Sequence, residues 1–518
     1  MLKTVTLIAC LFLTACMMVG PNYKDPKRQV AEHWPKKNST VKESPPQDAN
    51  WWKVFHDPVL TTLINQSYHN NLSIQSAGVR VLQARAQLAQ SVGQLYPQQQ
   101  ALLGNYTYNR IGGGSLQGLL PQSFLTALLG FSASWEIDFW GKYRRAIQAN
   151  DASFFASVAA YDNALVTLTA DVASTYIKIR TLEQQIKVTK ANIQVQAMGL
   201  RIARSRYTNG QTSLVDVEQA QTELSETQAK LPSYVNDLQR QKDALSVLLG
   251  TIPNGADKLL HKNHGIPKAP LTVAVGIPRE ALARRPDIYQ ARQEAIAQSA
   301  AIGAAKANLF PSFSLVGTFA FTSNNIGNNS IGDILHWQNR AITAGPNFTW
   351  PILNYGQITN AVRVQDAAFQ QSLLNYLNLV LKAQQEVQDN ISGYIEAKQA
   401  ELYLIQANQA ATKTLKLTFI RYKEGETDFT PVLNAEQQQL RIQTSLVNAQ
   451  GDIPQALVAL YRALGGGWQI RNGNDIVPEK IKAEMAARTN WGTLLKQENH
   501  MPPVTKKEQF KQIYLPKW

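Results

Sequence analysis

Two short stretches of this chain share the pattern Arg-Tyr-x-x-Gly, and this repetition limits what the chain can fold into. They are Arg206-Tyr207-Thr208-Asn209-Gly210 and Arg421-Tyr422-Lys423-Glu424-Gly425, so the second follows the first by 215 residues. Each stretch ends a long helical pattern, and a second helical pattern starts at Leu214 or Phe429. Gly210 and Gly425 stand where a helix commonly ends with a positive φ. The sequence therefore predicts two long helical hairpins with similar tips.

Other residues repeat at the same offset, which indicates an internal duplication. The matching pairs are Trp135 with Trp350, Gly141 with Gly356, Val217 with Val432, Ala220 with Ala435, and Gly250 with Gly465. We expect a first repeat over residues 58–250, with its tip at 206–214, and a second repeat over 282–465, with its tip at 421–429. The linker 251–281 and the tail 466–518 are expected to form a collar midway along the helices.

Each repeat contains a segment in which the period changes from helical spacing to strict alternation. In residues 98–137 and 312–351, apolar and aromatic side chains alternate with small or polar ones, which predicts a β-hairpin in each. Four strands cannot close a barrel by themselves, and a lipid environment excludes open sheet edges. We therefore expect closure by further copies of the chain: two copies would supply eight strands and three would supply twelve. Phe131 and Phe319 are expected to face lipid or the membrane interface, and Thr318 the lumen.

The helical patterns differ in length. Residues 142–209 and 357–424 would each form a helix about 100 Å long, at about 1.5 Å per residue. The patterns at 58–96 and 214–250 are little more than half as long, so we expect two short helices to stack end to end beside one long helix. The fold class is therefore mainly α with a small transmembrane β part.

The N-terminus has the features of a bacterial lipoprotein signal. Lys3 precedes the apolar run Val5–Leu13, and Leu13-Thr14-Ala15-Cys16 resembles a lipobox. Residues 1–15 would be removed, and Cys16 would carry S-diacylglycerol and an N-acyl chain. Residues 16–57 would form a lipidated arm. Because Cys10 is lost with the signal, a disulfide is excluded and stability must come from packing and assembly.

Several kinds of function are disfavoured by what the sequence contains. The formal charge is +14, but the basic residues are scattered, which argues against nucleic-acid binding. His261 and His264 form a His-x-x-His pair without carboxylate or cysteine partners, so we expect no metal site and no cofactor besides the lipid. No catalytic motif is evident, and the chain is not expected to be an enzyme. A structural coiled-coil lipoprotein is a further alternative, although such a rod needs no strands.

Several strings, together with the lipobox and the duplication, resemble the TolC-like outer membrane factors, in particular their lipoprotein branch of the NodT, OprM and CusC type. The strings are Gly20-Pro21-Asn22-Tyr23, Trp51-Trp52, Leu282–Ile288 and Leu460–Trp468. The resemblance implies a homotrimer in the outer membrane of a Gram-negative bacterium, with a twelve-stranded barrel continued by an α-helical barrel. It implies efflux with a periplasmic adaptor and an inner-membrane pump. An outer membrane component of type I protein secretion is the alternative.

The tips are the expected functional region. Residues predicted to form the tips and dock an adaptor are Arg206, Tyr207, Gly210, Leu214, Arg421, Tyr422, Gly425 and Phe429. Leu214 and Phe429 could instead pack inside their own hairpins. The resemblance also implies carboxylates around a periplasmic gate, for which the candidates are Asp216, Asp428, Asn434 and Glu436. Asn434 stands where related proteins frequently have an aspartate, so a gate of the usual composition is not expected.

Overall fold

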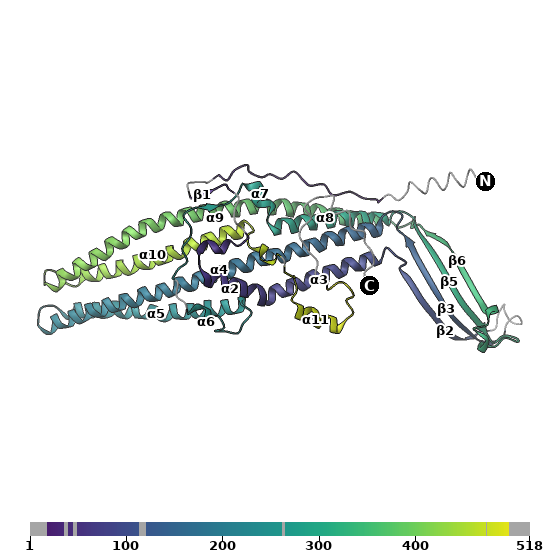
Figure 1. Ribbon diagram of the computed structural model, residues 1–518, viewed down its shortest axis with the longest axis horizontal. Helices are drawn as coiled ribbons and strands as arrows, with labels where there is room; N and C mark the ends of the chain where they lie inside the picture. The colour runs from purple at the N-terminus through teal and green to yellow at the C-terminus, as the bar shows by residue number, and fades with distance from the viewer. Residues whose placement is uncertain are drawn as a thin grey trace.

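The computed structural model describes residues 18–35, 40–44, 49–112, 121–261, 265–472 and 474–496. The protein is elongated, with a bundle of long helices at one end and a four-stranded sheet at the other (Figure 1). Cys16 and His264 lie outside the described residues. Within the described part of the chain, no helix has the length and apolar character needed to cross a membrane.

Two helices of equal length run along the bundle. They are α4 (Lys142–Thr208) and α9 (Gln357–Lys423), each of 67 residues and therefore about 100 Å long. Each follows a glycine in the left-handed region, Gly141 or Gly356. The duplication is thus visible as two matching long helices, as the sequence predicts.

Shorter helices lie end to end beside the long ones. Helix α3 (Leu72–Gly93) and helix α5 (Leu214–Leu248) both pack against α4, while α8 (Pro286–Ala307) and α10 (Thr430–Ala463) pack against both α4 and α9. In each pair the first helix lies on the strand side and the second runs to the tips (Figure 1). This arrangement confirms the predicted stacking.

The prediction of one continuous helix over residues 58–96 is wrong, because the structure has two helices there, α2 (Pro58–Asn70) and α3. Asn71 between them has an extended backbone, and its side-chain oxygen accepts a hydrogen bond from the Ile74 amide at 3.1 Å. Its side-chain amide donates to the Leu248 carbonyl at 2.9 Å, at the end of α5. Gly250 packs so closely on Asn70 that a Cβ there would lie 2.3 Å from the Asn70 carbonyl oxygen. The break therefore makes room for the end of α5, a contact that helical periodicity does not reveal.

The four strands form one antiparallel sheet. They are β2 (Gln99–Arg110), β3 (Ser123–Ile137), β5 (Ser312–Asn324) and β6 (Arg340–Thr349), in the order β2-β3-β5-β6. Both hairpins thus join through β3 and β5, while β2 and β6 are the edges. Short 3-10 turns, η2 (Ile331–Asp333) and η3 (Trp337–Asn339), lie between β5 and β6.

The register divides the sheet into two chemically different faces. One row across the sheet consists of Leu102, Phe131, Phe319 and Ile342. The neighbouring row, on the opposite face, consists of Ala101, Ser132, Thr318 and Thr343. Because successive side chains of a strand point to opposite faces, Phe131 and Phe319 share an apolar face and Thr318 belongs to the polar one. The alternation seen in the sequence therefore continues across all four strands.

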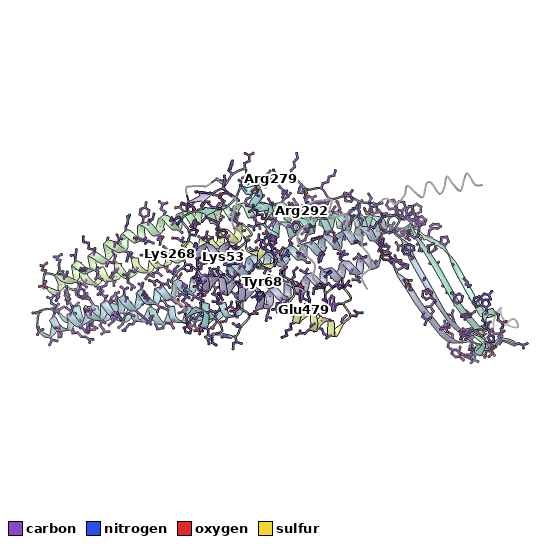
Figure 2. The ribbon with its side chains drawn as sticks, viewed as in Figure 1. Lys53, Tyr68, Lys268, Arg279, Arg292 and Glu479 are labelled. Carbon is purple, nitrogen blue, oxygen red and sulfur yellow. The ribbon has the colours of Figure 1, made fainter. Side chains whose placement is uncertain are left out.

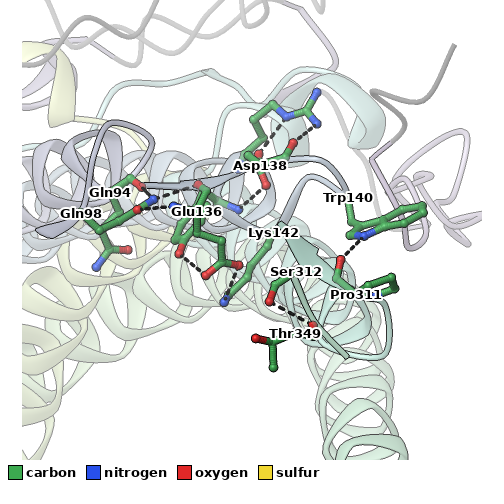
Figure 3. A network of polar contacts seen from close by, with 11 residues as sticks. Gln94, Gln98, Glu136, Asp138, Trp140, Lys142, Pro311, Ser312 and Thr349 are labelled. Carbon is green, nitrogen blue, oxygen red and sulfur yellow. Dashed lines mark hydrogen bonds and ion pairs between the residues drawn. The ribbon is translucent and has the colours of Figure 1, made fainter. Parts of the chain in front are cut away.

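The junction between sheet and helices repeats one contact in both halves. The indole nitrogen of Trp135 donates to the Leu95 carbonyl, and that of Trp350 donates to the Leu309 carbonyl, each at 3.1 Å. Figure 3 shows the polar network at the end of β3, where Glu136 accepts a hydrogen bond from Lys142 at 3.2 Å. Trp140 donates to the Pro311 carbonyl at 2.8 Å and so ties the first repeat to the second.

Short elements surround the middle of the bundle, where Figure 2 labels Lys53, Arg279 and Glu479. They are η1 (Trp51–Phe55), α6 (Asp257–Leu260), α7 (Pro278–Ala283), η4 (Trp468–Arg471), α11 (Glu479–Arg488) and the parallel pair β1 (Val41–Lys42) and β4 (Val273–Ala274). The N-terminal arm docks here, since the buried Trp34 donates to the Gly276 carbonyl at 3.0 Å.

The specific strings noted in the sequence pack together in this region. Trp51 stacks on Tyr461 with ring centroids 5.4 Å apart, and both side chains are buried. Arg285 donates to the Ala463 carbonyl and pairs with Asp287 at 2.8 Å. Arg471 pairs with the buried Asp162, whose pKa burial raises to about 6 although Arg471 opposes the shift. These strings therefore join the tail and linker to the middle of the helices.

Candidate functional site

The two predicted tips lie at the same end of the bundle, remote from the sheet (Figure 1). Helix α10 packs against α4, so the second hairpin lies beside the first. The helices share an apolar cluster, which consists of Leu200, Ala203, Val217, Ala220, Leu224, Leu415, Tyr422, Phe429, Val432 and Ala435. Every helix of both hairpins contributes to this cluster, so one small core holds the tips together.

At the second tip the repeated aromatic residues are buried. Tyr422 and Phe429 are both 0% exposed, and their rings meet edge to face with centroids 5.3 Å apart. The guanidinium of Arg206 lies 4.6 Å from the centre of the Tyr422 ring and donates to the Tyr422 carbonyl. Arg206 thus reaches from the first tip and covers the second.

At the first tip the equivalent residues are exposed. Tyr207 is 45% exposed and Leu214 is 49% exposed. Arg421, the counterpart of Arg206, pairs with Glu426 of its own tip at 3.2 Å, and both side chains are largely solvated. The structure therefore separates the predicted tip residues into a packed set at the second tip and a free set at the first.

Asp216 is buried beside Tyr422. It accepts hydrogen bonds from the Thr212 hydroxyl and, at 3.4 Å, from the Tyr422 hydroxyl. Burial, followed by the charge of Asp216, raises the pKa of Tyr422 to about 12. Tyr422 therefore stays protonated and donates to the carboxylate, which connects α5 with the end of α9.

The other gate candidates fall into two environments. Asp428 and Asn434 are exposed, and Asp428 accepts from the Thr430 amide at 3.3 Å. Glu436 is only 2% exposed and therefore does not edge an opening in this conformation, contrary to the expectation. Its position explains the difference, because it follows the buried Val432 by four residues and lies on the same helical face. The predicted gate residues do not form one ring within a single chain.

The sequence prediction missed the partner of Glu436. Glu223 on α5 is 4% exposed and accepts from Gln196 at 3.2 Å and from Gln437 at 2.7 Å. Burial, and then the charge of Glu223, raises the pKa of Glu436 to about 7. The available signal was that Glu223 shares a helical face with Ala220 and Thr227, both of which are buried.

A groove runs between α5 and α10 next to these carboxylates. Its lining residues include Leu214, Val215, Glu218, Glu223, Glu226, Leu433 and Gln437. In the part of the chain that the structure covers, no three His, Cys, Asp or Glu side chains are placed to share a metal ion. The groove is thus acidic on its α5 side and apolar toward the tip.

Comparison with known proteins decides the family. The sequence model of the family described as "Outer membrane efflux protein" matches residues 63–251 and 277–466, which are the two repeats. The chain belongs to the outer membrane efflux proteins. The resemblance to TolC-like outer membrane factors inferred from the sequence is therefore confirmed.

Individual relatives cover almost the whole chain of this efflux protein. It is 26% identical to the probable outer membrane lipoprotein SilC of Salmonella typhimurium, over 90% of this chain and 99% of SilC. It is 28% identical to the toluene efflux pump outer membrane protein TtgC of Pseudomonas putida, over 90% of this chain and 96% of TtgC. The family resemblance thus extends through strands, helices and collar alike.

Solved structures have the same fold. The outer-membrane channel OprN superposes with a TM-score of 0.77 at 28% identity, over 87% of this chain and 100% of OprN. The Campylobacter jejuni CmeC outer membrane channel superposes with a TM-score of 0.78 at 22% identity, over 90% of this chain and 100% of CmeC. The efflux protein is therefore an outer membrane channel with a long helical part and a small sheet.

Proposed function

We propose that this efflux protein is the exit duct of a tripartite system, formed by three copies of the chain, that passively conducts solutes from a periplasmic adaptor and an inner-membrane pump. The observation that carries the proposal is the sheet. It has one apolar face and one small or polar face, and its edge strands β2 and β6 pair with no further strand of the described residues. Edges facing lipid must be paired, so β2 of one copy pairs with β6 of the next. A rod-like lipoprotein would need no such sheet.

The helical part supports the same assembly. Helix α4 packs against helices of both repeats, whereas the helices that pack most extensively against α9 in the described residues, α8 and α10, belong to its own repeat. Large apolar side chains along α9 are more than half exposed: Val364, Leu374, Leu381, Leu402, Tyr403 and Leu417. An exposed apolar stripe of this length is typical of an interface. A second copy covers it, and three copies make twelve strands and a closed helical tube.

In this proposal, the solutes that are exported are selected by the pump and not by the duct. Relatives on this architecture are named for the efflux of toluene, of cations and of pyoverdine. A wide duct has few contacts with which to select a solute, so the pump determines what is carried. In this proposal the chain itself performs no catalysis.

Single-channel recording tests the duct. The purified full chain in planar bilayers should give discrete openings whose size is the same from one insertion to the next. A chain that folds and assembles but gives no openings between pH 5 and pH 8, even with the adaptor present, would contradict the proposal.

Paired substitutions test the orientation of the sheet. Phe319→Arg places a charge on the lipid face and should cost roughly 2–4 kcal/mol, which lowers the yield of assembled protein. Thr318→Arg, on the opposite face, should leave the yield unchanged and alter conductance. Equal loss of yield in both variants would mean that the two faces are assigned wrongly.

Adaptor docking is proposed at the tips. Thr212→Cys and Thr427→Cys place a thiol at each tip, and Arg279→Cys places one on the exposed side of α7 in the middle of the bundle. In cells that contain the cognate adaptor, a short bifunctional reagent should capture the adaptor from the tip positions. Capture from position 279 alone would place the adaptor at the collar instead.

The lipid on Cys16 adds an anchor to the barrel. Three acyl chains bind a membrane firmly. A closed barrel also spans the membrane without them, because its outer surface is apolar. The Cys16→Ser variant behind a substitute cleavable signal should therefore lose palmitate labelling and still fractionate with the outer membrane, at reduced yield. A soluble, folded variant in the periplasm would contradict the barrel.

A further inference from the structure

Two carboxylates lie together in the contact between the hairpins, away from the tips themselves. Glu223 of α5 and Glu436 of α10 are 4% and 2% exposed, and the charge of Glu223 acts on Glu436. They stand at the border of the apolar cluster, next to Leu224 and Ala435. Two buried carboxylates whose charges act on each other cannot both be ionised without a cost in free energy.

The polar groups around the two carboxylates form hydrogen bonds with Glu223 but leave one oxygen of Glu436 without a donor in the described part of the chain. Both Glu223 oxygens accept hydrogen bonds, from Gln196 and Gln437. In contrast, Oε1 of Glu436 and Oε1 of Gln196 have no hydrogen-bond partner among the described residues. Gln196 is itself 2% exposed, and its amide group is directed at Glu223. A buried acceptor oxygen beside a buried carboxylate is satisfied when that carboxylate carries a proton.

No buried cation balances the two carboxylates within the described residues. Helix α4 presents Gly199 to Glu436, and a Cβ on this glycine would lie 3.3 Å from Oε1; the Phe419 ring of α9 lies at the same place. Five basic residues on the neighbouring stretches of α4, α9 and α10 are exposed to solvent: Arg201, Arg204, Lys413, Lys416 and Arg441. The nearby carboxylates Glu218 and Glu226 line the groove and add negative charge.

We propose that Glu436, buried next to Glu223, carries a proton in this conformation, and that loss of this proton loosens the contact between α10 and the α4–α5 hairpin. The pair is then a pH-sensitive latch within each chain. The pH dependence of this contact within one chain rests only on the packing of α10 against the α4–α5 hairpin. Its consequence, a duct whose periplasmic end opens more readily as the pH rises, rests on the proposed function.

The direction follows from the shift of Glu436. Its pKa is raised from 4.5 to about 7 in the packed state, so the packed state binds the proton more tightly than a separated state. The contact is strongest below about pH 4.5, weakens as the pH rises from there to about 7, and changes little above that value. Each unit of pKa difference corresponds to about a tenfold change in the ratio of separated to packed hairpins.

The duplication places this latch in only one of two related contacts. The counterparts of Glu223 and Glu436 in the other repeat are Gln438 and Gln221. In the proposed trimer, the equivalent contact between copies would bring these two glutamines together, and amides do not titrate. The contact inside each chain is therefore sensitive to pH, and the contact between chains is not.

Spin labels on Val215→Cys and Leu433→Cys, which line opposite sides of the groove, report the separation of α5 and α10 in the assembled full chain. Between pH 5 and pH 7.5 the separated population should rise at least tenfold. Glu436→Gln should hold the packed distance throughout, and Glu223→Gln should flatten the response. Glu226→Gln, an exposed neighbour, should leave the pH dependence unchanged.

Three outcomes would overturn the latch. One is a distance that does not change with pH, and another is an unchanged response in Glu436→Gln. The third is packing retained at pH 8 by millimolar calcium or magnesium and lost with chelator, which would mean that a divalent cation occupies the pair. Single-channel recording of the same variants separates this proposal from the previous one. If the distance responds to pH but no channel opens, the latch stands and the duct assignment fails.

Discussion

The two tips of this efflux protein share the pattern Arg-Tyr-x-x-Gly but have opposite surroundings. At the second tip, Tyr422 and Phe429 are buried, and Arg206 of the first hairpin packs on the Tyr422 ring. At the first tip, Tyr207 and Leu214 are about half exposed, and Arg421 pairs only within its own tip. The difference lies in what each tip has beside it, because the first hairpin lies on one flank of the second.

The comparison bears on the proposed trimer. There, the contact between the hairpins of one chain would be a template for the contact between copies. In the proposed trimer, the Arg421 side chain of one copy would cover Tyr207 of the next, as Arg206 covers Tyr422 within the chain. The asymmetry of the single chain is then removed by the trimer, except at the pair formed by Glu223 and Glu436.

The largest difference between the tips is expected for their apolar residues. Phe429→Ala empties a fully buried site and should cost about 3–5 kcal/mol of tip stability. Leu214→Ala should cost less than about 1 kcal/mol in the dispersed chain, because half of the side chain is already in water. Limited proteolysis of the tips in urea measures both variants. A larger cost for Leu214→Ala in the trimer than in the dispersed chain would mean that the trimer buries the first tip. Equal costs for Phe429→Ala and Leu214→Ala in the dispersed chain would contradict the difference between the tips.

The arginines should differ next. Arg206→Ala removes a cation–π contact and hydrogen bonds from a charged donor to backbone carbonyls, which together should cost about 2–3 kcal/mol. Arg421→Ala removes an ion pair that is solvated on both sides and should cost less than about 1 kcal/mol. The same proteolysis midpoints report the effect. Arg206→Lys keeps the charge but not the planar fork, so it should lie between the two variants.

The glycines provide a point at which the tips should agree. Gly210 and Gly425 have φ of 69° and 85°; a Cβ at Gly210 would have no atom within 4 Å, and one at Gly425 would make only an ordinary contact, 3.6 Å from Nη2 of Arg206. Alanine should therefore cost about 1–2 kcal/mol at each tip, for backbone reasons alone. A much greater cost at position 425 than at 210, by thermal unfolding, would show that neighbours affect even the turn.

The smallest expected difference concerns the hydroxyl groups. Tyr422→Phe deletes the donor to the buried Asp216 and should cost about 0.5–1.5 kcal/mol. Tyr207→Phe should have no measurable effect, since the side chain is half exposed. Adding Asp216→Asn gives a double-mutant cycle that isolates this one hydrogen bond. A cycle energy of zero would mean that burial of the Tyr422 ring, and not its hydroxyl, matters at the second tip.

Features that depend on local periodicity could be predicted from the amino-acid sequence. Helical spacing gave the two long helices and the turns at Gly210 and Gly425, and alternation gave the four strands with Phe319 and Thr318 on opposite faces. The offset of 215 residues linked the two halves. Each of these is written in short-range patterns, because helix and strand geometry set which neighbours along the chain share a face.

Which of two equivalent residues is buried depends on packing between helices that are distant in sequence. The break at Asn71 depends on the end of α5, the burial of Tyr422 depends on Arg206 from another helix, and the pairing of Glu223 with Glu436 joins helices 213 residues apart in sequence. Burial and pKa follow from what surrounds a side chain in space, and turns that share a sequence pattern can have different surroundings. The repeat therefore predicted two tips, and their packing made them unlike.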